Sequence, residues 1–482
     1  MRNSGPTNFP AALNRLNGGL RLRSTKNIAK WRTALARVLP QNELSFTADV
    51  LAKYAGDKWF AAQLPEAVAF PRNADSVSKL LRFASAHRIP VTPRGAGYGY
   101  VGGAVPVRGG IVVSLEKMNR IREIHPADFV AVVEPGVITA DLQEAAVAKG
   151  LFYPPDPASR GDSFIGGNIA TNAGGPRCLK YGVTRDYVLG LQVALADGTL
   201  VRVGGRTHKN KTGFDFSRLF TGSEGMLAVI TEATLKLLPL PPSRACLEIG
   251  FDSLKPAVRA LHSIFAAGLL PCAIEVADAF TVAAAYNRTR SPRLKRCRAH
   301  MIVELDGQAK SVKGEINDLE RIVRKHKPLF IERGFGEKQC EAIWQIRREF
   351  SYSLRDTGLT KLNQDIVVPR GRLEDLFRFA KKLQLKHQLP IACFGHAGDG
   401  NIHVNIMVDY NEPQANRRAD AALDSLFRQV LAWDGAITGE HGIGLAKKPW
   451  WPLAASKDLQ RLHRLVKDAL DPHGILNPGK FI

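Results

Sequence analysis

Between residues 46 and 238, short apolar runs alternate with glycine-rich turns along the chain. The runs "GGIVVSLEKM", "AVVEPGV", "LQVALADGTLVRV" and "LAVITEATLKLLP" have the length and β-branched content that predict β-strands. One stretch between two turns, "ADSVSKLLRFASAHR", instead carries Val77, Leu80, Leu81 and Ala84 at helical spacing, with Asp75 near its start. This pattern predicts an α+β domain.

A second set of elements follows Pro239, Pro241 and Pro242, which stop both helix and sheet. Its predicted strands are "RACLEIGF", "AHMIVELDG", "PIACFGH" and "NIHVNIMVD", and they alternate with helical segments such as "SLKPAVRALHSIFAAG" and "GRLEDLFRFAKKLQLKH". The alternation predicts an α+β domain in which helices cover an antiparallel sheet. The limits that we expect are a basic N-terminal extension over 1–45, a first domain over 46–242, a second domain over 243–430 and a C-terminal segment over 431–482.

Composition narrows the class of protein. A chain of 482 residues is too long for one ordinary core, and its 45% hydrophobic and 23% charged residues are typical of globular proteins. We find no apolar run long enough to cross a bilayer, so we expect no membrane span. The six cysteines are scattered without a CxxC pair, which indicates neither a disulfide framework nor a cysteine-ligated zinc or iron–sulfur cluster.

The net charge of +22 is unusual, and +8 of it precedes Glu43, the first acidic residue. Such a balance favours anionic partners, which include acidic lipid headgroups, nucleic acid and carboxylate substrates. The basic N-terminus has the composition of an organelle transit peptide, but a plain extension that packs on the domain or lies on a membrane surface explains it better. We expect a cytoplasmic protein that can be peripheral to the inner membrane, or a mitochondrial one if the extension is a transit peptide.

Two glycine-rich segments stand out in the first domain. Gly97-Tyr-Gly-Tyr-Val-Gly102 formally matches the dinucleotide-binding pattern GxGxxG, but a further glycine-rich stretch and the β run "IVVSL" follow it instead of a helix. The loop "PRGAGYGYVGG" has five glycines in nine residues, and "GGNIATNAGG" over 166–175 is equally bare. Together they predict a cradle of backbone N–H groups for a pyrophosphate, against which a flat ring can lie. The alternative is that both are merely tight turns.

The second domain carries a candidate metal site. "CFGHAGDGNIHVNIMV" reads as a β-hairpin in which His396 pairs across to His403, so that both imidazoles and Asn405 lie on one face. Two facing imidazoles suit zinc, manganese or iron, and a catalytic site then needs a carboxylate as third ligand. The segment "TGEHGIG" offers Glu440, and we expect its neighbour His441 to be an unligated base.

The segments "PRGAGYGYVGGAV", "VEPGVITADLQEAAVAKGLFYPPDPAS", "IGGNIATNAGG" and "TGSEGMLAVITEATLKLLP" resemble the FAD domain of the vanillyl-alcohol oxidase and p-cresol methylhydroxylase (PCMH) superfamily. The resemblance implies an α+β fold with FAD extended between two subdomains, and a non-covalent flavin because neither loop contains histidine. The chain departs from the family at Ala96 and Tyr98, where glycine and threonine are usual. With these two departures included, the resemblance implies that the following positions bind FAD: Arg94, Gly95, Ala96, Gly97, Tyr98, Gly99, Pro155, Ser159, Gly166, Gly167, Asn168, Thr171, Gly174, Gly175, Ile230 and Asn477.

The pair "HAGDGNIHVNI" and "GEHGIG" resembles the C-terminal domain of D-lactate, D-2-hydroxyglutarate and glycolate dehydrogenases of this superfamily. The resemblance implies that His396, His403 and Glu440 are metal ligands, that Asn405 contacts substrate or metal, and that His441 is the base. The metal would lower the pKa of the substrate hydroxyl while hydride passes to flavin N5.

An anionic substrate also needs a cation. The segment "WQIRREFSYSLRDTGLTKLNQDIVVP" offers Arg347, Arg348, Lys361 and Asn363, and the resemblance favours an arginine after the tryptophan and the lysine. A guanidinium can bind a carboxylate bidentately. The alternative is that these residues are solvated charges on a helix.

These observations predict an FAD-dependent dehydrogenase that converts a small D-2-hydroxy acid into the 2-oxo acid. The substrates that we expect are D-lactate or D-2-hydroxyglutarate. Its partners would be the hydroxy acid and a separate acceptor, either a quinone, a cytochrome or an electron-transfer flavoprotein; peripheral membrane contact and a homodimer stay open. One rival is a flavin oxidase of a related hydroxy acid or glycolate that uses O₂. A rival from another class, a nucleic-acid or anionic-surface binder, accounts for the charge but leaves the glycine segments unexplained.

Overall fold

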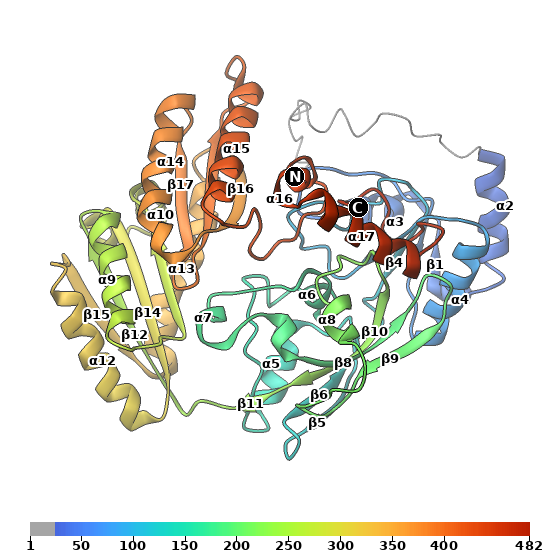
Figure 1. Ribbon diagram of the computed structural model, residues 1–482, viewed down its shortest axis with the longest axis horizontal. Helices are drawn as coiled ribbons and strands as arrows, with labels where there is room; N and C mark the ends of the chain where they lie inside the picture. The colour runs from blue at the N-terminus through green and yellow to red at the C-terminus, as the bar shows by residue number, and fades with distance from the viewer. Residues whose placement is uncertain (1–24) are drawn as a thin grey trace. The chain divides into compact units, whose positions relative to one another are not determined.

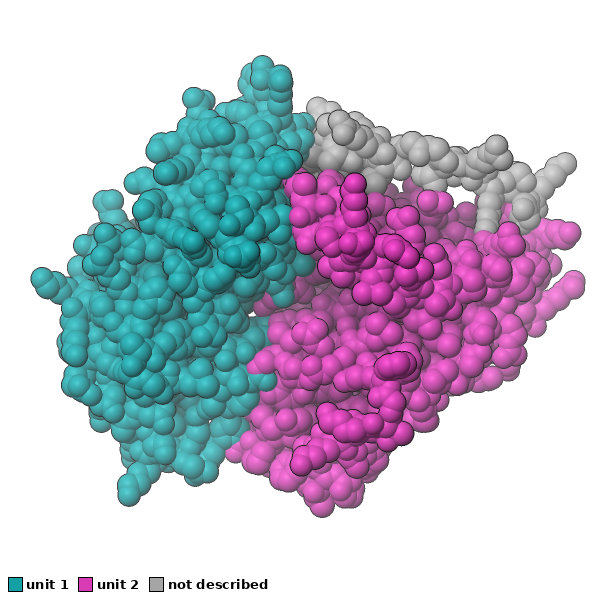
Figure 2. Space-filling model, viewed as in Figure 1, with its two compact units in different colours: residues 1–18, 175–181, 241–439 teal, residues 19–174, 182–240, 440–482 magenta. Residues whose placement is uncertain are grey.

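The structure, a computed structural model, describes residues 25–482, and the first 24 residues of the expected basic extension lie outside the described part (Figure 1). The described chain forms two compact units (Figure 2). Unit 1 comprises residues 175–181 and 241–439, and unit 2 comprises residues 25–174, 182–240 and 440–482. In the described part, no helix has both the length and the apolar character needed to cross a membrane.

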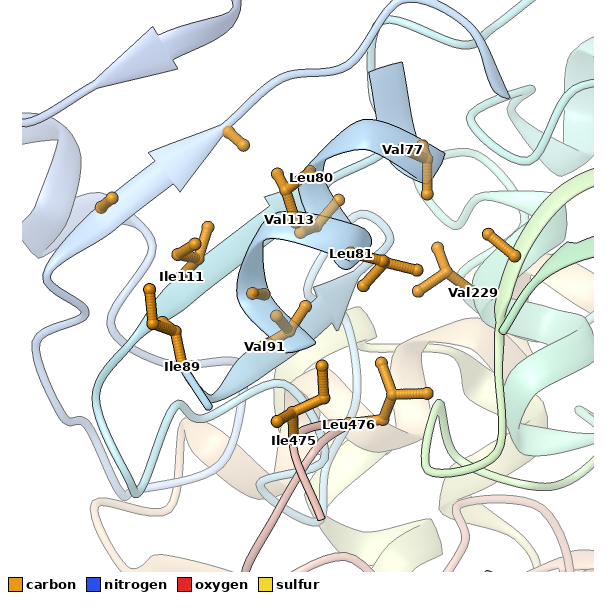
Figure 3. Packing of buried hydrophobic residues seen from close by; sticks show 14 of the residues in the cluster. Val77, Leu80, Leu81, Ile89, Val91, Ile111, Val113, Val229, Ile475 and Leu476 are labelled. Carbon is orange, nitrogen blue, oxygen red and sulfur yellow. The ribbon is translucent and has the colours of Figure 1, made fainter. Parts of the chain in front are cut away.

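Unit 2 contains a mixed sheet with the strand order β1-β2-β4-β3, in which β2 and β3 both run parallel to β4. Val77, Leu80 and Leu81 of the predicted helix pack onto this sheet, as Figure 3 shows, because their helical spacing puts them on one face. The helix begins after Asn73, whose side chain accepts the N–H of Ser76. The elements are β1 (Leu44–Ser45), β2 (Ala67–Ala69), α4 (Ala74–Ala86), β3 (Val91–Arg94) and β4 (Ile111–Ser114).

Both ends of the described chain join the core of this sheet. Trp31 and Leu35 of α2 (Thr25–Leu35) are buried in it, so this part of the basic extension packs on the domain. Ile475 and Leu476 are buried in the same cluster, and Leu476 forms a parallel bridge with Val91 (Figure 3). Residues 440–482 of the expected C-terminal segment are therefore part of unit 2, whereas its first residues, 431–439, belong to unit 1.

A second, fully antiparallel sheet of unit 2 has the strand order β5-β6-β10-β8-β9. The predicted strands of residues 121–236 all lie in it, and together with the first sheet it confirms the expected pair of α+β subdomains. The elements are β5 (Ile121–His125), β6 (Val130–Val133), α5 (Thr139–Val147), α6 (Ile165–Thr171), β8 (Val188–Ala194), β9 (Leu200–Gly204), α8 (Phe216–Phe220) and β10 (Val229–Lys236). Unit 2 also contains the short helix α3 (Ala48–Lys53) and an antiparallel pair of short strands, β7 (Leu151–Phe152) and β11 (Leu238–Pro239).

Unit 1 is built on one seven-stranded sheet with the order β15-β12-β14-β13-β17-β18-β16, in which every pair is antiparallel. This arrangement confirms the predicted antiparallel sheet covered by helices. Helices α10 and α13 pack on the face that carries Phe394 and Met407. The strands are β12 (Ser243–Phe251), β13 (Ala273–Ala277), β14 (Ala299–Gly307), β15 (Phe330–Phe335), β16 (Thr360–Val367), β17 (Ile391–His396) and β18 (Asn401–Val408). The helices are α9 (Leu254–Ala266), α10 (Ala279–Thr289), α12 (Ala309–Arg324), α13 (Gly336–Arg355), α14 (Leu373–His387) and α15 (Ala415–Ala432).

Of the two glycine-rich segments, the first has the conformation that we predicted and the second does not. The loop that begins at Gly95 continues without a helix to β4, which agrees with our rejection of a Rossmann site. The second segment, which we expected to be an open loop, starts inside α6. Within this helix Gly166 packs closely against Pro135: a Cβ at this position would lie 2.6 Å from that of Pro135. The short segment 175–181 that follows belongs to unit 1, which the continuous limits of 46–242 did not anticipate.

Candidate active site

The histidine hairpin consists of β17, a turn over residues 397–400 and β18. We expected His396 to pair with His403, but His396 pairs with Asn401 and His403 with Phe394. The register differs because the turn starts one residue earlier than expected, with Gly400 at φ +85. The alternation of side chains still puts both imidazoles on one face, with ring centroids 5.6 Å apart, and both are buried.

A buried carboxylate of the neighbouring strand orients the first histidine. Glu275 on β13 pairs with His396, and its Oε1 lies 2.5 Å from His396 Nδ1, while its Oε2 accepts the Nε–H of Arg347 at 2.5 Å. Burial would raise the pKa of Glu275, but His396 and Arg347 lower it to about 2. An ionised Glu275 keeps the proton on Nδ1, so Nε2 is the atom that can bind a metal. The sequence analysis missed Glu275, although an acid within the apolar run "CAIEVA" was a usable signal.

The third predicted ligand comes from the segment that follows β18 and α15. In unit 1, His396 and His403 offer two imidazole nitrogens from one face of the hairpin, and Glu440, at the start of the last part of unit 2, offers a carboxylate. Glu440 directly follows Gly439, whose N–H donates to Asp365 Oδ2 at 2.9 Å. Two imidazoles and one carboxylate are a donor set that fits zinc, manganese or iron with a coordination position left for substrate.

Asn405 and Asn363 lie on the same face of the sheet as the two histidines. Each has an amide oxygen without a hydrogen-bond partner in the described chain. Asn405 is fully buried, and its Nδ2 donates to the carbonyl oxygens of Ala392 at 3.1 Å and His403 at 3.0 Å. Its Oδ1 has no partner, and neither does Oδ1 of Asn363, which is paired with Asn405 across β16 and β18. Because buried polar atoms are normally satisfied, these two oxygens indicate a bound ligand or water.

The predicted cations separate into two groups. Arg347 binds Glu275 and stacks on Phe394, with the guanidinium carbon 4.8 Å from the ring centroid. Lys361 Nζ donates to Ser351 Oγ at 2.7 Å; burial, helped by the charges of nearby arginines that include Arg347, lowers the pKa of Lys361 to about 8. Arg348, by contrast, is exposed and pairs with Glu341, so the structure does not bring it to Glu275 and His396.

In unit 2, the first glycine-rich loop wraps around its own arginine. Arg94 donates to the carbonyl of Gly56, lies 5.2 Å from the ring centroid of Tyr54, and occupies the place that a Cβ on Gly97 would take. Burial lowers the pKa of Arg94, and nearby acidic groups partly offset this effect. Tyr98, one of the two departures from the family, lies under Lys58, whose Nζ is 4.5 Å from the ring centroid.

The bare backbone of the two glycine segments fits a flat cofactor. A Cβ on Gly95 would lie 3.4 Å from Gly167 Cα, so the two segments approach closely. A Cβ on Gly103 or Gly167 would meet no atom within 4 Å, which shows open space above both residues. Close backbones that border open space are the arrangement that FAD requires of such loops.

Several other predicted FAD positions use their polar groups within the protein. Asn168 Nδ2 donates to Thr139 at 2.7 Å, Thr171 donates to the carbonyl of Gly167 at 3.1 Å, and the carbonyl of Pro155 accepts from Gln143 at 2.9 Å. Asn477 differs: its Nδ2 donates to the carbonyls of Gly103 and Glu224, whereas its buried Oδ1 has no partner in the described chain. The remaining positions are half-buried Ala96 and Ser159, exposed Gly99, buried Ile230 on β10, and Gly174 and Gly175 after α6.

Glu440 and His441 both lie against these glycine segments. A Cβ on Gly174 would be 3.0 Å from Glu440 Oε1, so glycine makes room for that carboxylate. The His441 ring contacts Tyr100 of the first loop, with centroids 5.4 Å apart. The segment that supplies the third candidate ligand and the candidate base therefore contacts both halves of the proposed flavin cradle.

Comparison with known proteins identifies the family of the chain. A family model of the C-terminal domain of FAD-linked oxidases matches residues 240–481, and a model of an FAD-binding domain matches residues 65–204. Glycolate oxidase subunit GlcD of Bacillus subtilis is 38% identical and covers 87% of this chain and 89% of its own length. D-lactate dehydrogenase of Anaerostipes hadrus is 32% identical, with coverage of 92% and 94%. D-2-hydroxyglutarate dehydrogenase of Stutzerimonas stutzeri is 33% identical, with coverage of 90% and 95%.

Among solved structures, p-cresol methylhydroxylase with bound substrate has a TM-score of 0.78 to this chain and covers 95% of it and 97% of its own length. At 19% identity this similarity concerns the fold alone. It confirms the PCMH-type FAD-binding fold that the glycine-rich motifs predict.

Proposed function

The chain belongs to the family of FAD-linked oxidases and is an FAD-dependent oxidoreductase, and from this premise we propose that it oxidises a small D-2-hydroxy acid to the 2-oxo acid. D-lactate and D-2-hydroxyglutarate are the preferred substrates, because relatives named for them match nearly the whole chain. Glycolate is a second candidate, since a glycolate oxidase subunit is 38% identical.

One observation carries the proposal. Glu440 and His441 are consecutive residues of unit 2 that lie against the two glycine-rich segments: a Cβ on Gly174 would be 3.0 Å from Glu440 Oε1, and the His441 ring contacts Tyr100. A metal ligand and a base that adjoin a flavin-binding loop are what oxidation of an alcohol next to a carboxylate requires.

We assign each residue a role by its chemistry. When bound, FAD supplies the two-electron acceptor and a divalent metal, zinc, manganese or iron, supplies a Lewis acid. His396, His403 and Glu440 would hold the metal, and a neutral His441 takes the proton of the substrate hydroxyl.

The substrate's carboxylate needs its own recognition group. Arg347 and Lys361 supply positive charge in the same part of unit 1, and Asn405 offers its partnerless Oδ1 to the substrate. Because the pKa of Lys361 is about 8, its charge is retained at neutral pH.

For the electron acceptor we propose a separate quinone, cytochrome or electron-transfer flavoprotein, which makes the protein a dehydrogenase. We propose a cytoplasmic site of action with the net charge of +22 drawing the protein toward anionic membrane lipid, or a mitochondrial one if the N-terminus is cleaved. A homodimer is compatible with this scheme.

The test is an anaerobic absorbance spectrum of the FAD-loaded protein, recorded before and after D-lactate, D-2-hydroxyglutarate or glycolate is added, with L-lactate as the control. We expect one D-acid or glycolate to bleach the flavin band near-completely and a chelator to prevent the bleaching. A flavin that none of these acids reduces would reject the proposed function.

The two histidine roles predict different losses. His441→Ala should retain FAD and metal but slow flavin reduction by on the order of 10²–10⁴-fold, because the base is missing. His403→Ala should retain FAD but lose the metal as well as activity. Metal content measured by elemental analysis, together with stopped-flow reduction, separates the two. A His441→Ala protein with the normal reduction rate would remove this residue from the mechanism.

A further inference from the structure

Asp365 of unit 1 binds the segment that leads into Glu440. This residue of β16 is fully buried, and its Oδ2 accepts the N–H of Gly439 at 2.9 Å and the hydroxyl of Thr438 at 3.1 Å. Its Oδ1 accepts from Asn401 Nδ2 at 2.7 Å, at the start of β18. One carboxylate thus joins the histidine hairpin to the two residues that precede Glu440.

Glu224 of unit 2 binds the segment that leaves His441. It is buried, and its two oxygens accept the N–H groups of Ile443 at 2.7 Å and Gly444 at 2.8 Å. The carboxylate reaches this backbone because residue 442 is glycine, at φ +83: a Cβ there would lie 2.7 Å from Glu224 Oε1.

Glu224 is itself held by the proposed flavin cradle. Its N–H donates to the carbonyl of Ala170 in α6 at 2.8 Å, and its carbonyl accepts from Asn477 at 2.7 Å. The carbonyl of Val101 in the first glycine-rich loop accepts the N–H groups of Leu445 at 2.7 Å and Ala446 at 3.0 Å. The chain after His441 is therefore tied to both glycine-rich segments.

The segment 438–444 needs such external support. It has neither helix nor strand, and three of its seven residues are glycine, so its own backbone resists bending only weakly. Each oxygen of a carboxyl group can accept a backbone N–H, and burial strengthens such hydrogen bonds. Burial raises the pKa of Glu224, and the N–H groups of Ile443 and Gly444 act in the opposite direction. Neutral amides of the same size could accept at only one atom and would turn an N–H₂ group toward the other donor.

We propose that Asp365 and Glu224 are positioning residues that clamp the backbone on the two sides of Glu440 and His441, Asp365 setting the metal-binding carboxylate and Glu224 the base. This inference rests on the proposed function for the role of His441, whereas the role of Asp365 can be tested by metal binding alone. The expected magnitude follows from geometry, because a misplacement of about 1 Å at a reacting group can cost on the order of 100-fold in rate.

For Asp365 the test is calorimetric titration of the FAD-loaded protein with Zn²⁺ or Mn²⁺. Asp365→Asn should weaken metal binding by about 10–100-fold, as loss of support for a metal ligand generally does. The matched control is Asp278→Asn in the same unit: Asp278 also accepts two backbone N–H groups, those of Thr281 at 2.9 Å and Cys393 at 2.8 Å. If Asp365→Asn fails to fold, Thr438→Val removes one of the same bonds and should weaken metal binding in the same direction. Equal metal affinity in Asp365→Asn and its control would overturn the role of Asp365.

For Glu224 the test is stopped-flow reduction by the acid that bleaches the wild-type flavin. Glu224→Gln should lower the limiting reduction rate at least about tenfold, with unchanged FAD content, metal affinity and half-saturating substrate concentration. Asp471→Asn is the control, since Asp471 accepts the N–H groups of Ile475 at 3.0 Å and Leu476 at 2.8 Å. Gly442→Ala, which places a methyl against the Glu224 carboxylate, is the second variant if Glu224→Gln does not fold.

The outcomes separate the inference from the proposed function. A wild-type flavin that no acid reduces would reject the proposed function and with it the role of Glu224, while the metal titration still decides the role of Asp365. A wild-type enzyme that works, with a Glu224→Gln limiting rate equal to that of its control, would overturn the clamp at His441.

Discussion

Glu275 is not a candidate metal ligand itself, but it contacts two residues of the candidate site. Its carboxylate fixes the tautomer of His396 through Nδ1 and holds the guanidinium of Arg347 through the other oxygen. The same residue thereby couples the proposed metal site to the proposed recognition of the substrate carboxylate. Since the pKa of Glu275 is lowered to about 2, it stays ionised throughout the range in which the enzyme can be assayed.

Replacement of Glu275 by glutamine tests this coupling. We expect Glu275→Gln to bind FAD normally but to bind Zn²⁺ or Mn²⁺ about 10–100-fold more weakly, because a neutral amide no longer favours the required tautomer. Glu304→Gln is the matched control: Glu304 is equally buried on the adjacent strand β14 and pairs with Arg244 at 2.8 Å, but the structure shows it next to no candidate metal ligand. Metal affinity that falls equally in both variants would reduce Glu275 to a structural role.

At the scale of elements, the hairpin and the short helix α6 put backbone where the chemistry needs it. In the hairpin, the four-residue turn fixes the register, and strand alternation then fixes the face of both histidines. In α6, consecutive glycines have opposite surroundings. Gly166 is pressed against Pro135, whereas Gly167 borders open space beside Gly95.

This contrast gives a paired prediction. Gly166→Ala should destabilise the protein by on the order of 1–3 kcal/mol, since its methyl group would overlap Pro135. Gly167→Ala should leave the thermal unfolding midpoint of the FAD-free protein nearly unchanged but raise the Kd for FAD, because its methyl group enters the proposed flavin space. Thermal unfolding without FAD and fluorescence titration with FAD provide both values. Unaltered FAD affinity in Gly167→Ala would place the cofactor elsewhere.

On the scale of the whole molecule, the question is how electrons leave the flavin. All six cysteines lie in the described part of the chain, none of them forms a disulfide and five are buried, and the described residues offer no group of cysteines that could bind a cluster as a relay. We propose that a separate acceptor approaches the flavin, and the charge of +22 would favour an anionic acceptor or an acceptor at an anionic membrane.

Reoxidation of the reduced flavin distinguishes a dehydrogenase from an oxidase. We expect the substrate-reduced protein to reoxidise slowly in air-saturated buffer and at least about tenfold faster with a soluble quinone, as a flavin poised for an external acceptor should. Stopped-flow absorbance follows both reactions under the same conditions. Rapid return in air alone would identify an oxidase, the alternative that similarity to a glycolate oxidase subunit keeps open.

Local patterns along the chain were enough to predict the elements and the chemistry that they carry. Apolar periodicity predicted the strands and helices, because alternation and helical spacing are local properties of the chain. The glycine segments and the pattern of two histidines with Glu440 and His441 indicated the cofactor class and the candidate ligands, since bare backbone and paired imidazoles have few other uses.

Features that depend on contacts between distant residues could be seen only in the folded chain. Folding shifted the hairpin register by the position of one turn, placed the second glycine segment in a helix that packs against Pro135, and joined Glu275 to His396 across 121 positions of sequence. The fold also gives Arg347 and Arg348 different surroundings, although they are identical residues next to each other in the chain: Arg347 binds Glu275, whereas Arg348 pairs with Glu341. The physical reason is that burial, hydrogen-bond partners and pKa are set by the packing of segments that the chain brings together only when it folds.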